Sequence, residues 1–197
     1  MDITMEATRL QDVSSRSRNK RVFDVIGAAA GLVVFAPVIV VIAGAILLDD
    51  GGPILFRQAR IGKDRHLFDI LKFRSMRDGA VTRVGRRLRA TGLDELPQFL
   101  NILNGEMSAV GPRPLTEYDV RRLGWDAPRY DFRWRVRPGL TGLAQVNATT
   151  STNRVSMMLD RRYIAEQCVS LDLALVAASF AVNVFGKARV RRFLRGR

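Results

Sequence analysis

The sequence has almost none of the side chains that build disulfides and zinc sites. It holds a single cysteine, Cys168, and a single histidine, His66. One cysteine cannot form an internal disulfide, which fits a reducing compartment, and these two residues are too few for a zinc site. Any metal bound by this chain would therefore be held by carboxylates and phosphate oxygens, as magnesium is.

Acidic residues are also few beside the basic ones. The chain carries 32 lysine and arginine residues against 19 aspartate and glutamate residues, a formal net charge of +13. This charge implies an acidic partner, which is nucleic acid, anionic lipid or a phosphorylated substrate. No internal repeat is visible, and the glycines match neither a phosphate-binding loop nor a dinucleotide fingerprint. A chain of 197 residues is long enough for one domain with a real core and barely for two.

What the sequence does have is a long uncharged run from Val25 to Leu48. Its 24 residues would span roughly 36 Å as a helix, enough for the hydrocarbon core of a bilayer. The run is too long for a signal peptide, and no small-residue cleavage motif follows it. Pro37 divides it into halves of about 18 Å, each too short to cross alone, because proline removes a backbone hydrogen bond and kinks a helix.

Basic residues flank this run on both sides. They are Arg16, Arg18, Lys20 and Arg21 before it, and Arg57, Arg60 and Lys63 after it. A spanning helix would put one cluster on the outer side, against the positive-inside rule. A helix that enters the membrane, breaks at Ala36-Pro37 and returns keeps both clusters, including Lys20 and Arg21, at the cytoplasmic surface. We therefore expect a re-entrant helix, with a spanning helix as the alternative.

Two short strands are expected next, after a glycine–proline turn. The segments 54–62 and 66–76 have strand-like patterns and are joined by a polar turn at Lys63-Asp64-Arg65. Alternation in the second segment places Lys72 and Arg74 on one face. Two interpretations stay open for this face, a solvated hairpin surface or basic groups gathered where anionic head groups attract them.

Two adjacent carboxylates, Asp94 and Glu95, stand in a strongly basic neighbourhood. An amphipathic helix is predicted just after them, with Pro97 in its first turn, from apolar residues at i, i+3, i+4 and i+7, which are Leu96, Phe99, Leu100 and Leu103. The pair would lie at the N-terminus of this helix, where the dipole favours negative charge and phosphate alike. It is either an N-cap with a solvated acid, or a nucleophilic carboxylate beside a metal-binding one.

Three arginines are candidates for binding phosphate. Arg89 lies five residues before Asp94, whereas Arg113 and Arg137 lie on loops stiffened by proline and glycine. Rigid display of a guanidinium is what anion capture requires. A helix predicted around 155–167 carries Asp160 and Tyr163 at i and i+3, hence on one face.

The remaining segments point to a membrane surface. Residues 115–135 interleave aromatic side chains with arginines, a pattern of nucleic-acid binding or of interfacial anchors, and the upstream apolar run favours the membrane. The apolar segment 171–185 is too short to span and is expected to be a core or interfacial helix. The basic tail at 187–197 is expected to contact anionic lipid.

Taken together and in this order, the motifs resemble the bacterial sugar transferase family, the monotopic phosphoglycosyl transferases that start glycan assembly on a polyprenyl phosphate. The resemblance covers roughly residues 20–185. The matching stretches are Lys20-Arg21-Val22-Phe23-Asp24, the proline-broken run, Phe68–Met76, Leu93–Gln98, Gly105–Ser108, Val110–Pro114, Val136–Asn147, and Asp160 with Tyr163. Ala36-Pro37 matches the small-residue–proline break of the family's re-entrant helix.

The resemblance implies a role for each site residue. Asp94 would attack the β-phosphorus of a UDP-sugar, release UMP and carry the phosphosugar covalently until a polyprenyl phosphate, undecaprenyl phosphate in most bacteria, accepts it. Glu95 would be the Mg²⁺ ligand beside this nucleophile. Binding of substrate or phosphate would fall to Lys72, Arg74, Arg89, Arg113, Arg137, Asp160 and Tyr163.

The expected fold is α+β and mainly helical. It comprises a polar lead-in at 1–19 without assigned function, a membrane re-entrant helix at 20–50 broken at Pro37, a compact cytoplasmic catalytic domain at 51–186 with a short β-hairpin and interfacial amphipathic helices, and a basic tail at 187–197. The resemblance leads us to expect the small form of the family, with the catalytic domain only.

The resemblance places the protein on the bacterial inner membrane, with its catalytic domain on the cytoplasmic face. The expected partners are a UDP-sugar, polyprenyl phosphate and membrane lipid, with no nucleic acid, and a homodimer is left open. The alternatives to an enzyme are a membrane-anchored polyanion-binding module and an inactive scaffold subunit. The sequence identifies neither the sugar nor the glycan.

Overall fold

The computed structural model describes residues 3–147 and 153–185, so the predicted basic tail at 187–197 lies outside the described residues. The helices are α1 (Ile3–Asp50), α2 (Arg83–Thr91), α3 (Gln98–Asn104), α4 (Glu117–Leu123), α5 (Leu143–Asn147), α6 (Asn153–Glu166) and α7 (Val169–Phe185). The strands are β1 (Leu55–Ile61), β2 (Leu67–Phe73), β3 (Met76–Arg77), β4 (Ala80–Val81), β5 (Ser108–Val110) and β6 (Gly139–Thr141). Short 3-10 segments are η1 (Lys63–Arg65), η2 (Leu93–Glu95) and η3 (Pro128–Arg135). The mainly helical character is as predicted.

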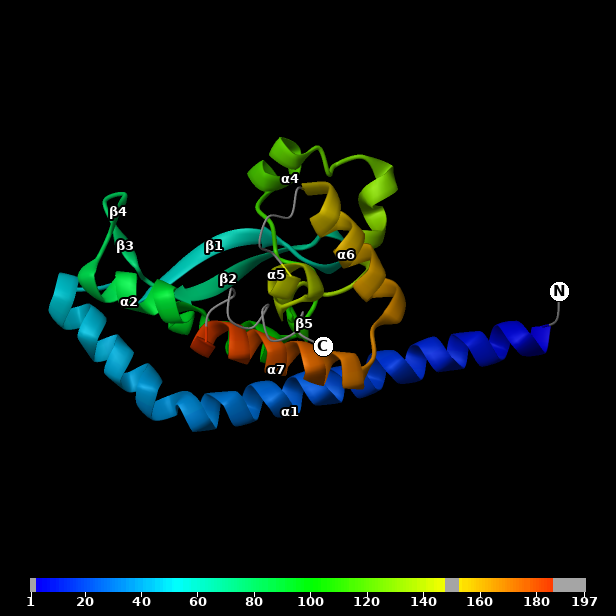
Figure 1. Ribbon diagram of the computed structural model, residues 1–197, viewed down its shortest axis with the longest axis horizontal. Helices are drawn as coiled ribbons and strands as arrows, with labels where there is room; N and C mark the ends of the chain where they lie inside the picture. The colour runs from blue at the N-terminus through cyan, green and yellow to red at the C-terminus, as the bar shows by residue number, and fades with distance from the viewer. Residues whose placement is uncertain (1–2, 148–152, 186–197) are drawn as a thin grey trace.

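Helix α1 contains the whole segment that was expected to re-enter the membrane. It runs from Ile3 to Asp50 with Pro37 inside it, and Figure 1 shows it bending along the base of the molecule without a gap. The polar lead-in is the first part of this same helix. The expected break is therefore a bend, because a proline removes one backbone hydrogen bond while the turns on either side continue.

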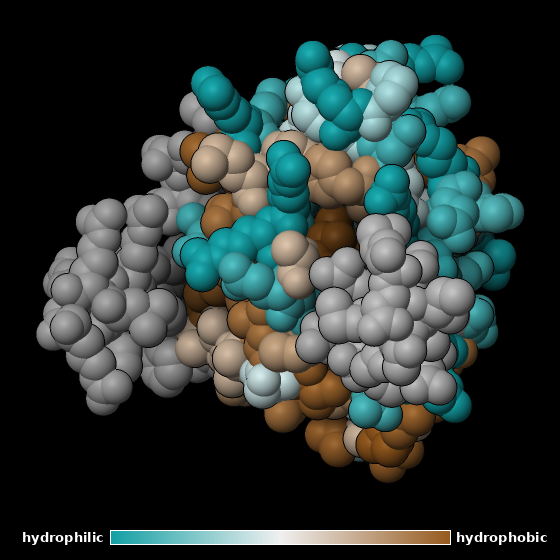
Figure 2. Space-filling model, turned by 90° about the vertical axis from the view of Figure 1, so that its right-hand side faces the viewer, coloured by the Kyte–Doolittle hydropathy of each residue, from teal (hydrophilic) through white to brown (hydrophobic). Residues whose placement is uncertain are grey.

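The outer face of α1 is apolar and exposed. Among the described residues, the stretch Arg18–Asp50 is long and apolar enough to cross a membrane, and only 11% of its most apolar window is buried in the protein. Strongly exposed apolar side chains on it include Val33, Val34, Val40 and Val41. Figure 2 shows hydrophobic residues gathered at the bottom of the molecule, below a hydrophilic upper part.

The inner face of α1 forms much of the core. Ala28 is buried in a cluster with Phe68 of β2 and Ile102 of α3. Further along the helix, Ile42 and Ile46 are buried in a cluster that includes Phe73, Leu88 and Leu96. Because β2, α2 and α3 all pack on α1, the apolar helix and the carboxylate segment belong to one folded body.

The predicted hairpin is confirmed. Strands β1 and β2 pair antiparallel, with Leu55 opposite Phe73 and Ile61 opposite Leu67. A second small hairpin, β3 with β4, was not expected. Nor was the parallel pairing of β5 with β6, which joins segments almost thirty residues apart.

At helix α3, three of the four apolar positions of the predicted amphipathic helix pack into the core, which are Leu96, Phe99 and Leu103. The helix begins at Gln98, and Leu100, expected in the core, is 40% exposed, while Ile102 is buried. Asn101 is also buried. Its polar amide is tolerated there because it accepts from the backbone N–H of Leu71 at 2.9 Å and donates to the carbonyl oxygen of Asp69 at 2.8 Å. These bonds attach α3 to the edge of β2.

The aromatic and arginine-rich segment is not an interfacial surface as a whole. Trp125 and Trp134 are buried in a core cluster, and Arg133 is only 3% exposed. The Arg133 guanidinium lies 5.3 and 5.1 Å from the two indole ring centroids and is paired with Asp160 at 3.0 Å. The prediction of an interfacial surface failed here because stacking on indole rings and pairing with a carboxylate stabilise an arginine in the core. Its alternation with aromatic residues therefore does not indicate exposure. Tyr118, in contrast, is exposed.

Candidate active site

The two adjacent carboxylates lie in a 3-10 turn, not in the first turn of α3. Helix α2 ends at Gly92, whose φ of 73° is left-handed, and η2 (Leu93–Glu95) follows directly. Pro97 is the N-cap of α3. The bonds from Asn101 to β2 hold this turn against the strand that carries Lys72.

Lys72 and Glu95 form the central ion pair of the site. The Lys72 ammonium lies 2.5 Å from Oε1 of Glu95, and both side chains are partly exposed. Burial and the negative charge of Glu95 raise the pKa of the Asp94 carboxyl, and the charges of Lys72 and Arg89 act in the opposite direction. The two carboxylates therefore differ: Glu95 is paired with a cation, whereas Asp94 has no ion-pair partner among the described residues.

Two stiff loops bring Arg113 next to this pair. Parallel pairing of β5 with β6 puts Gly111 against Gly139, where the Gly111 N–H donates to Thr141 O and the Gly139 N–H donates to Pro112 O, both at 2.9 Å. A Cβ atom on Gly139 would come within 2.0 Å of the Gly111 nitrogen, so neither loop can carry a larger residue there. The packing of the loops fixes the backbone that presents Arg113.

Two hollows meet at Glu95. The first, which we call the polar recess, is lined by Arg60, Lys72, Glu95, Gln98, Arg113 and Gln145, together with apolar neighbours. The second is a cavity of about 810 Å³, which we call the apolar cavity; its walls include Phe23 and Phe35 of α1, Phe99 of α3 and Phe180 of α7. Glu95, Arg113 and Gln145 line both. A polar site and an apolar one thus share a carboxylate and a guanidinium.

Several predicted site residues lie elsewhere. Alternation had placed Arg74 on one face with Lys72. The two side chains have different partners, since Arg74 pairs with Asp50 at the end of α1 and Lys72 pairs with Glu95. The Arg137 guanidinium donates to the carbonyl oxygen of Gly105 at 2.7 Å. Arg89, at the end of α2, is exposed and acts on Asp94 through its charge.

Asp160 and Tyr163 share one face of α6, as predicted, but both are buried and line neither hollow. Asp160 is the counter-ion of Arg133. The Tyr163 hydroxyl donates to Oδ1 of Asp172 at 2.7 Å and accepts from Lys20 at 3.0 Å. Their contacts hold the fold together.

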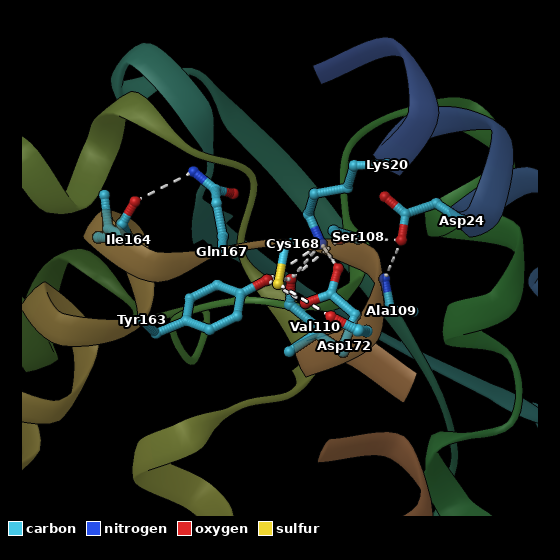
Figure 3. A network of polar contacts seen from close by, with 11 residues as sticks. Lys20, Asp24, Ser108, Ala109, Val110, Tyr163, Ile164, Gln167, Cys168 and Asp172 are labelled. Carbon is cyan, nitrogen blue, oxygen red and sulfur yellow. Dashed lines mark hydrogen bonds and ion pairs between the residues drawn. The ribbon is translucent and has the colours of Figure 1, made fainter. Parts of the chain in front are cut away.

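Lys20 and Arg21, expected at the membrane surface, instead contact the body of the protein. Figure 3 shows the Lys20 ammonium among Tyr163, Asp172 and Val110; it lies 2.5 Å from Oδ2 of Asp172 and 3.1 Å from Val110 O. Arg21 donates to the carbonyl oxygens of Ile102 and Leu103, at 2.6 and 2.8 Å.

The chain matches the family model described as bacterial sugar transferase over residues 15–186. The chain belongs to the bacterial sugar transferase family. The resemblance inferred from the ordered motifs is thereby confirmed.

The curated relatives of this sugar transferase carry informative names. This chain is 45% identical to the UDP-glucose:undecaprenyl-phosphate glucose-1-phosphate transferase of Caulobacter vibrioides, over 80% of this chain and 66% of that protein. It is 38% identical to the protein of that name from Escherichia coli, over 86% of this chain but 41% of that protein. The exopolysaccharide production protein PSS of Rhizobium leguminosarum is 35% identical, over 80% of this chain and 90% of that protein. The chain therefore spans between about a third and two thirds of the first curated relatives it matches.

The carboxylates of this sugar transferase suit magnesium. The described residues contain no group of three or more His, Cys, Asp or Glu side chains. Magnesium, however, commonly takes one or two protein carboxylates and completes its shell with substrate phosphates and water. Asp94 and Glu95 supply oxygen ligands only, and the ammonium at Glu95 shows that this carboxylate already stabilises a cation. The donor set therefore fits.

Sequence reasoning did not identify Arg60, Gln98 and Gln145 as site residues of this sugar transferase. Arg60 was counted only as one of the charges that flank the apolar run. Gln98 is a polar residue outside the predicted apolar positions of its helix, so the pattern does not predict its burial, yet it is 2% exposed. Only the pairing of β5 with β6 brings Gln145 to the site, and no local pattern predicts that pairing.

Proposed function

We propose that the protein transfers a phosphosugar from a UDP-sugar to undecaprenyl phosphate, releasing UMP, and so begins exopolysaccharide or other membrane glycan assembly. Relatives are named for UDP-glucose and undecaprenyl phosphate or for exopolysaccharide production. The observation that carries the proposal is the meeting of a cationic polar recess and an apolar cavity at one carboxylate segment. The recess offers cationic groups to a phosphate oxygen, and the cavity offers apolar walls to a lipid.

In the first step, an oxygen of Asp94 forms a bond to the β-phosphorus of the UDP-sugar. The bond from that phosphorus to the α–β bridging oxygen breaks, and its electron pair leaves with UMP. Carboxylate and diphosphate repel each other, so cationic groups are needed to neutralise the developing charge. Lys72, Arg89 and Arg113 are the basic side chains around the turn, and the pKa of Asp94, raised by burial, marks a carboxylate of increased basicity.

In the second step, a phosphate oxygen of undecaprenyl phosphate bonds to the same phosphorus and the Asp94 carboxylate leaves. The products are undecaprenyl diphosphosugar and free enzyme, and no water is consumed. The apolar cavity between α1, α3 and α7 supports this assignment, because a prenyl chain needs apolar walls beside the reacting phosphate. Two steps through one covalent intermediate let each substrate arrive from its own phase.

A magnesium ion would supply charge neutralisation at the phosphates. Glu95 is the residue we assign to hold it, and Asp94 lies beside Glu95 in the same turn. When Glu95 is engaged in this way, the Lys72 ammonium is free to pair with a phosphate oxygen. Lys72 would thus neutralise the Glu95 carboxylate when no magnesium is bound, and would bind a substrate phosphate when Glu95 holds the ion.

We place α1 in the cytoplasmic leaflet of the bacterial inner membrane as a re-entrant helix, with the catalytic domain on the cytoplasmic face. Contacts at both ends of its apolar run support this. Arg21 donates to the carbonyl oxygens of Ile102 and Leu103, whereas Asp50 pairs with Arg74 just after β2. A helix with both ends attached to one domain does not take its ends to opposite sides of a bilayer.

The test is UMP release by membrane-embedded protein supplied with UDP-sugars, undecaprenyl phosphate and Mg²⁺. Asp94→Asn keeps the shape but removes the nucleophile, and we expect release to fall about a thousandfold or more. Asp78→Asn is the matched control, since Asp78 is exposed on the β3–β4 hairpin. Trapping with donor alone should place a phosphosugar on the peptide that contains Asp94. Turnover of Asp94→Asn at the rate of the control would remove this residue from the chemistry.

A further inference from the structure

The polar recess contains buried polar atoms without partners. Nε of Arg60, Nε2 of Gln98 and Oε1 of Gln145 have no hydrogen-bond partner among the described residues, and all three side chains line the recess. A buried donor left unsatisfied loses its hydrogen bond to water and gains none in return, which is unfavourable. Groups of this kind are rare in native proteins and call for a specific explanation, such as an absent ligand or water.

The side chain of Gln98 is held in the recess by its surroundings. The residue is 2% exposed and opens α3, next to the turn that carries Asp94 and Glu95. Asn101, one turn later, ties the same helix to β2. The amide of Gln98 is therefore a buried donor on a fixed element, in a recess that is also lined by Glu95, the neighbour of the proposed nucleophile in the sequence.

Arg60 is fixed in the same way from the other side of the recess. One terminal nitrogen donates to Gln58 Oε1 at 2.6 Å, and the other donates to Pro114 O at 3.2 Å and lies 3.5 Å from Asp119. These contacts leave Nε free. Burial and, after it, the nearby charge of Arg113 lower the pKa of Arg60, while the charges of Asp119 and Glu95 act in the opposite direction.

The free space in the recess is very small. It measures about 10 Å³, close to the minimum for one water molecule. A nucleobase or a sugar ring does not fit, whereas a single oxygen atom does. Two donors and the surrounding cations suit an anionic oxygen, while Oε1 of Gln145 is an acceptor and takes no part in binding one.

We infer that the recess receives one non-bridging oxygen of the phosphoryl group that is transferred, with Nε2 of Gln98 and Nε of Arg60 as its donors. The inference rests on the proposed function. During attack by Asp94 this oxygen keeps its bond to phosphorus but gains negative charge, while the bridging oxygen departs with UMP. Donors already in place stabilise such charge in the transition state more than in the bound substrate.

The experiment follows the first step alone, as a burst of UMP from UDP-glucose and Mg²⁺ without lipid acceptor. Gln98→Met keeps the side-chain length and removes the donor. We expect the burst rate to fall about 100-fold or more, the usual loss for one oxyanion donor, with the half-saturating UDP-glucose concentration changing less than about threefold. Gln98→Glu, which puts a negative charge in the recess, should be slower still. Gln167→Met, the same change at a partly buried glutamine of the α6–α7 connection, should keep the wild-type rate.

Other results separate the possible failures. A wild-type rate in Gln98→Met, with or without a lower melting temperature, means that the recess holds only a structural water and overturns the inference. An unchanged maximal burst rate with a raised half-saturating concentration also overturns it, since the contact would then be one of ground-state binding. If Gln98→Met does not fold, Arg60→Lys, which keeps the charge but has no Nε donor, must show the same loss of rate. Absence of a burst from wild-type protein with every UDP-sugar of a panel refutes the proposed function instead.

Discussion

Asp94 and Glu95 are neighbours in the sequence, yet their surroundings give the two carboxylates different chemistry. Glu95 is neutralised by the ammonium of Lys72 at 2.5 Å. Asp94 has no ion pair within salt-bridge distance in the described part of the chain, and burial raises its pKa. Division of labour between two carboxylates is set by such differences in environment.

The activity should therefore have an acid limb above the ordinary titration range of aspartate. Asp94 must be ionised to attack, so the rate falls as pH drops through its pKa, which burial holds above the usual value of about 3.9. Because the charge of Arg89 lowers this pKa, Arg89→Gln should move the limb to still higher pH. The measurement is the pH profile of the UMP burst without lipid acceptor, whose own phosphate would otherwise titrate. A midpoint at the ordinary aspartate value would contradict the assignment.

Asp160 gives a prediction about stability at the same scale. It is 4% exposed and compensates the charge of Arg133, which is 3% exposed. Asp160→Ala should lower the free energy of unfolding by about 3–5 kcal/mol, because it leaves a buried charge unpaired. Denaturant unfolding in detergent checks this, and adding Arg133→Met should recover much of the loss. A raised half-saturating UDP-sugar concentration at unchanged stability would instead support the role in substrate binding implied by the family resemblance.

At the scale of elements, local patterns predicted what depends on local sequence. The strand-like patterns of 54–62 and 66–76 predicted the β1–β2 hairpin, and the helices predicted around 155–167 and over the apolar segment 171–185 are found as α6 and α7. The pairing of β5 with β6 was missed, because three-residue strands joined across a long separation have no periodic signal. That pairing presents Arg113 and brings Gln145 to the site. The sequence therefore predicted Arg113 as a phosphate-binding candidate but did not predict which residues surround it.

The start of α1 is another element whose partners lie far away in the sequence. Lys20 was interpreted as flanking charge of an apolar run, and Asp24 only as part of a stretch that matches the family, but both side chains contact the domain. Oδ1 of Asp24 accepts from the Ser108 hydroxyl at 3.0 Å and from the Ala109 N–H at 2.9 Å (Figure 3). Side chains four residues apart on one helical face thus anchor α1 to β5 and α7.

Removing this anchor should loosen α1 from the domain. Lys20→Met leaves the carboxylate of Asp172, which is fully buried, without its cation, and we expect a loss of about 3–5 kcal/mol in unfolding free energy. Arg18→Met, at an exposed residue of the same helix, should change stability little. The double variant Lys20→Met, Asp172→Asn should be less destabilised than the sum of its single changes. Strict additivity of the two changes would argue against the ion pair.

At the scale of the whole molecule, the apolar outer face and the polar contacts of α1 have to be satisfied at once. Exposed residues such as Val33, Val40 and Phe180 need lipid, while Arg21 and Asp50 remain attached to a water-facing domain. Insertion of the bent helix into one leaflet meets both requirements. A straight span would break the contacts at one end and move Lys20 and Arg21 across the bilayer, against the positive-inside rule.

Both ends of the chain should therefore lie on the cytoplasmic side. In a Cys168→Ser background, single cysteines introduced as Asp2→Cys and Gly196→Cys should resist a membrane-impermeant thiol reagent in intact spheroplasts and react after permeabilisation. Pro37→Leu restores a full helical hydrogen-bond pattern and favours a straight helix, so it should increase labelling at position 2 without changing position 196. Labelling of Asp2→Cys in intact spheroplasts with Pro37 present would replace the re-entrant helix with a spanning one, and the contacts of Arg21 and Asp50 could then not coexist.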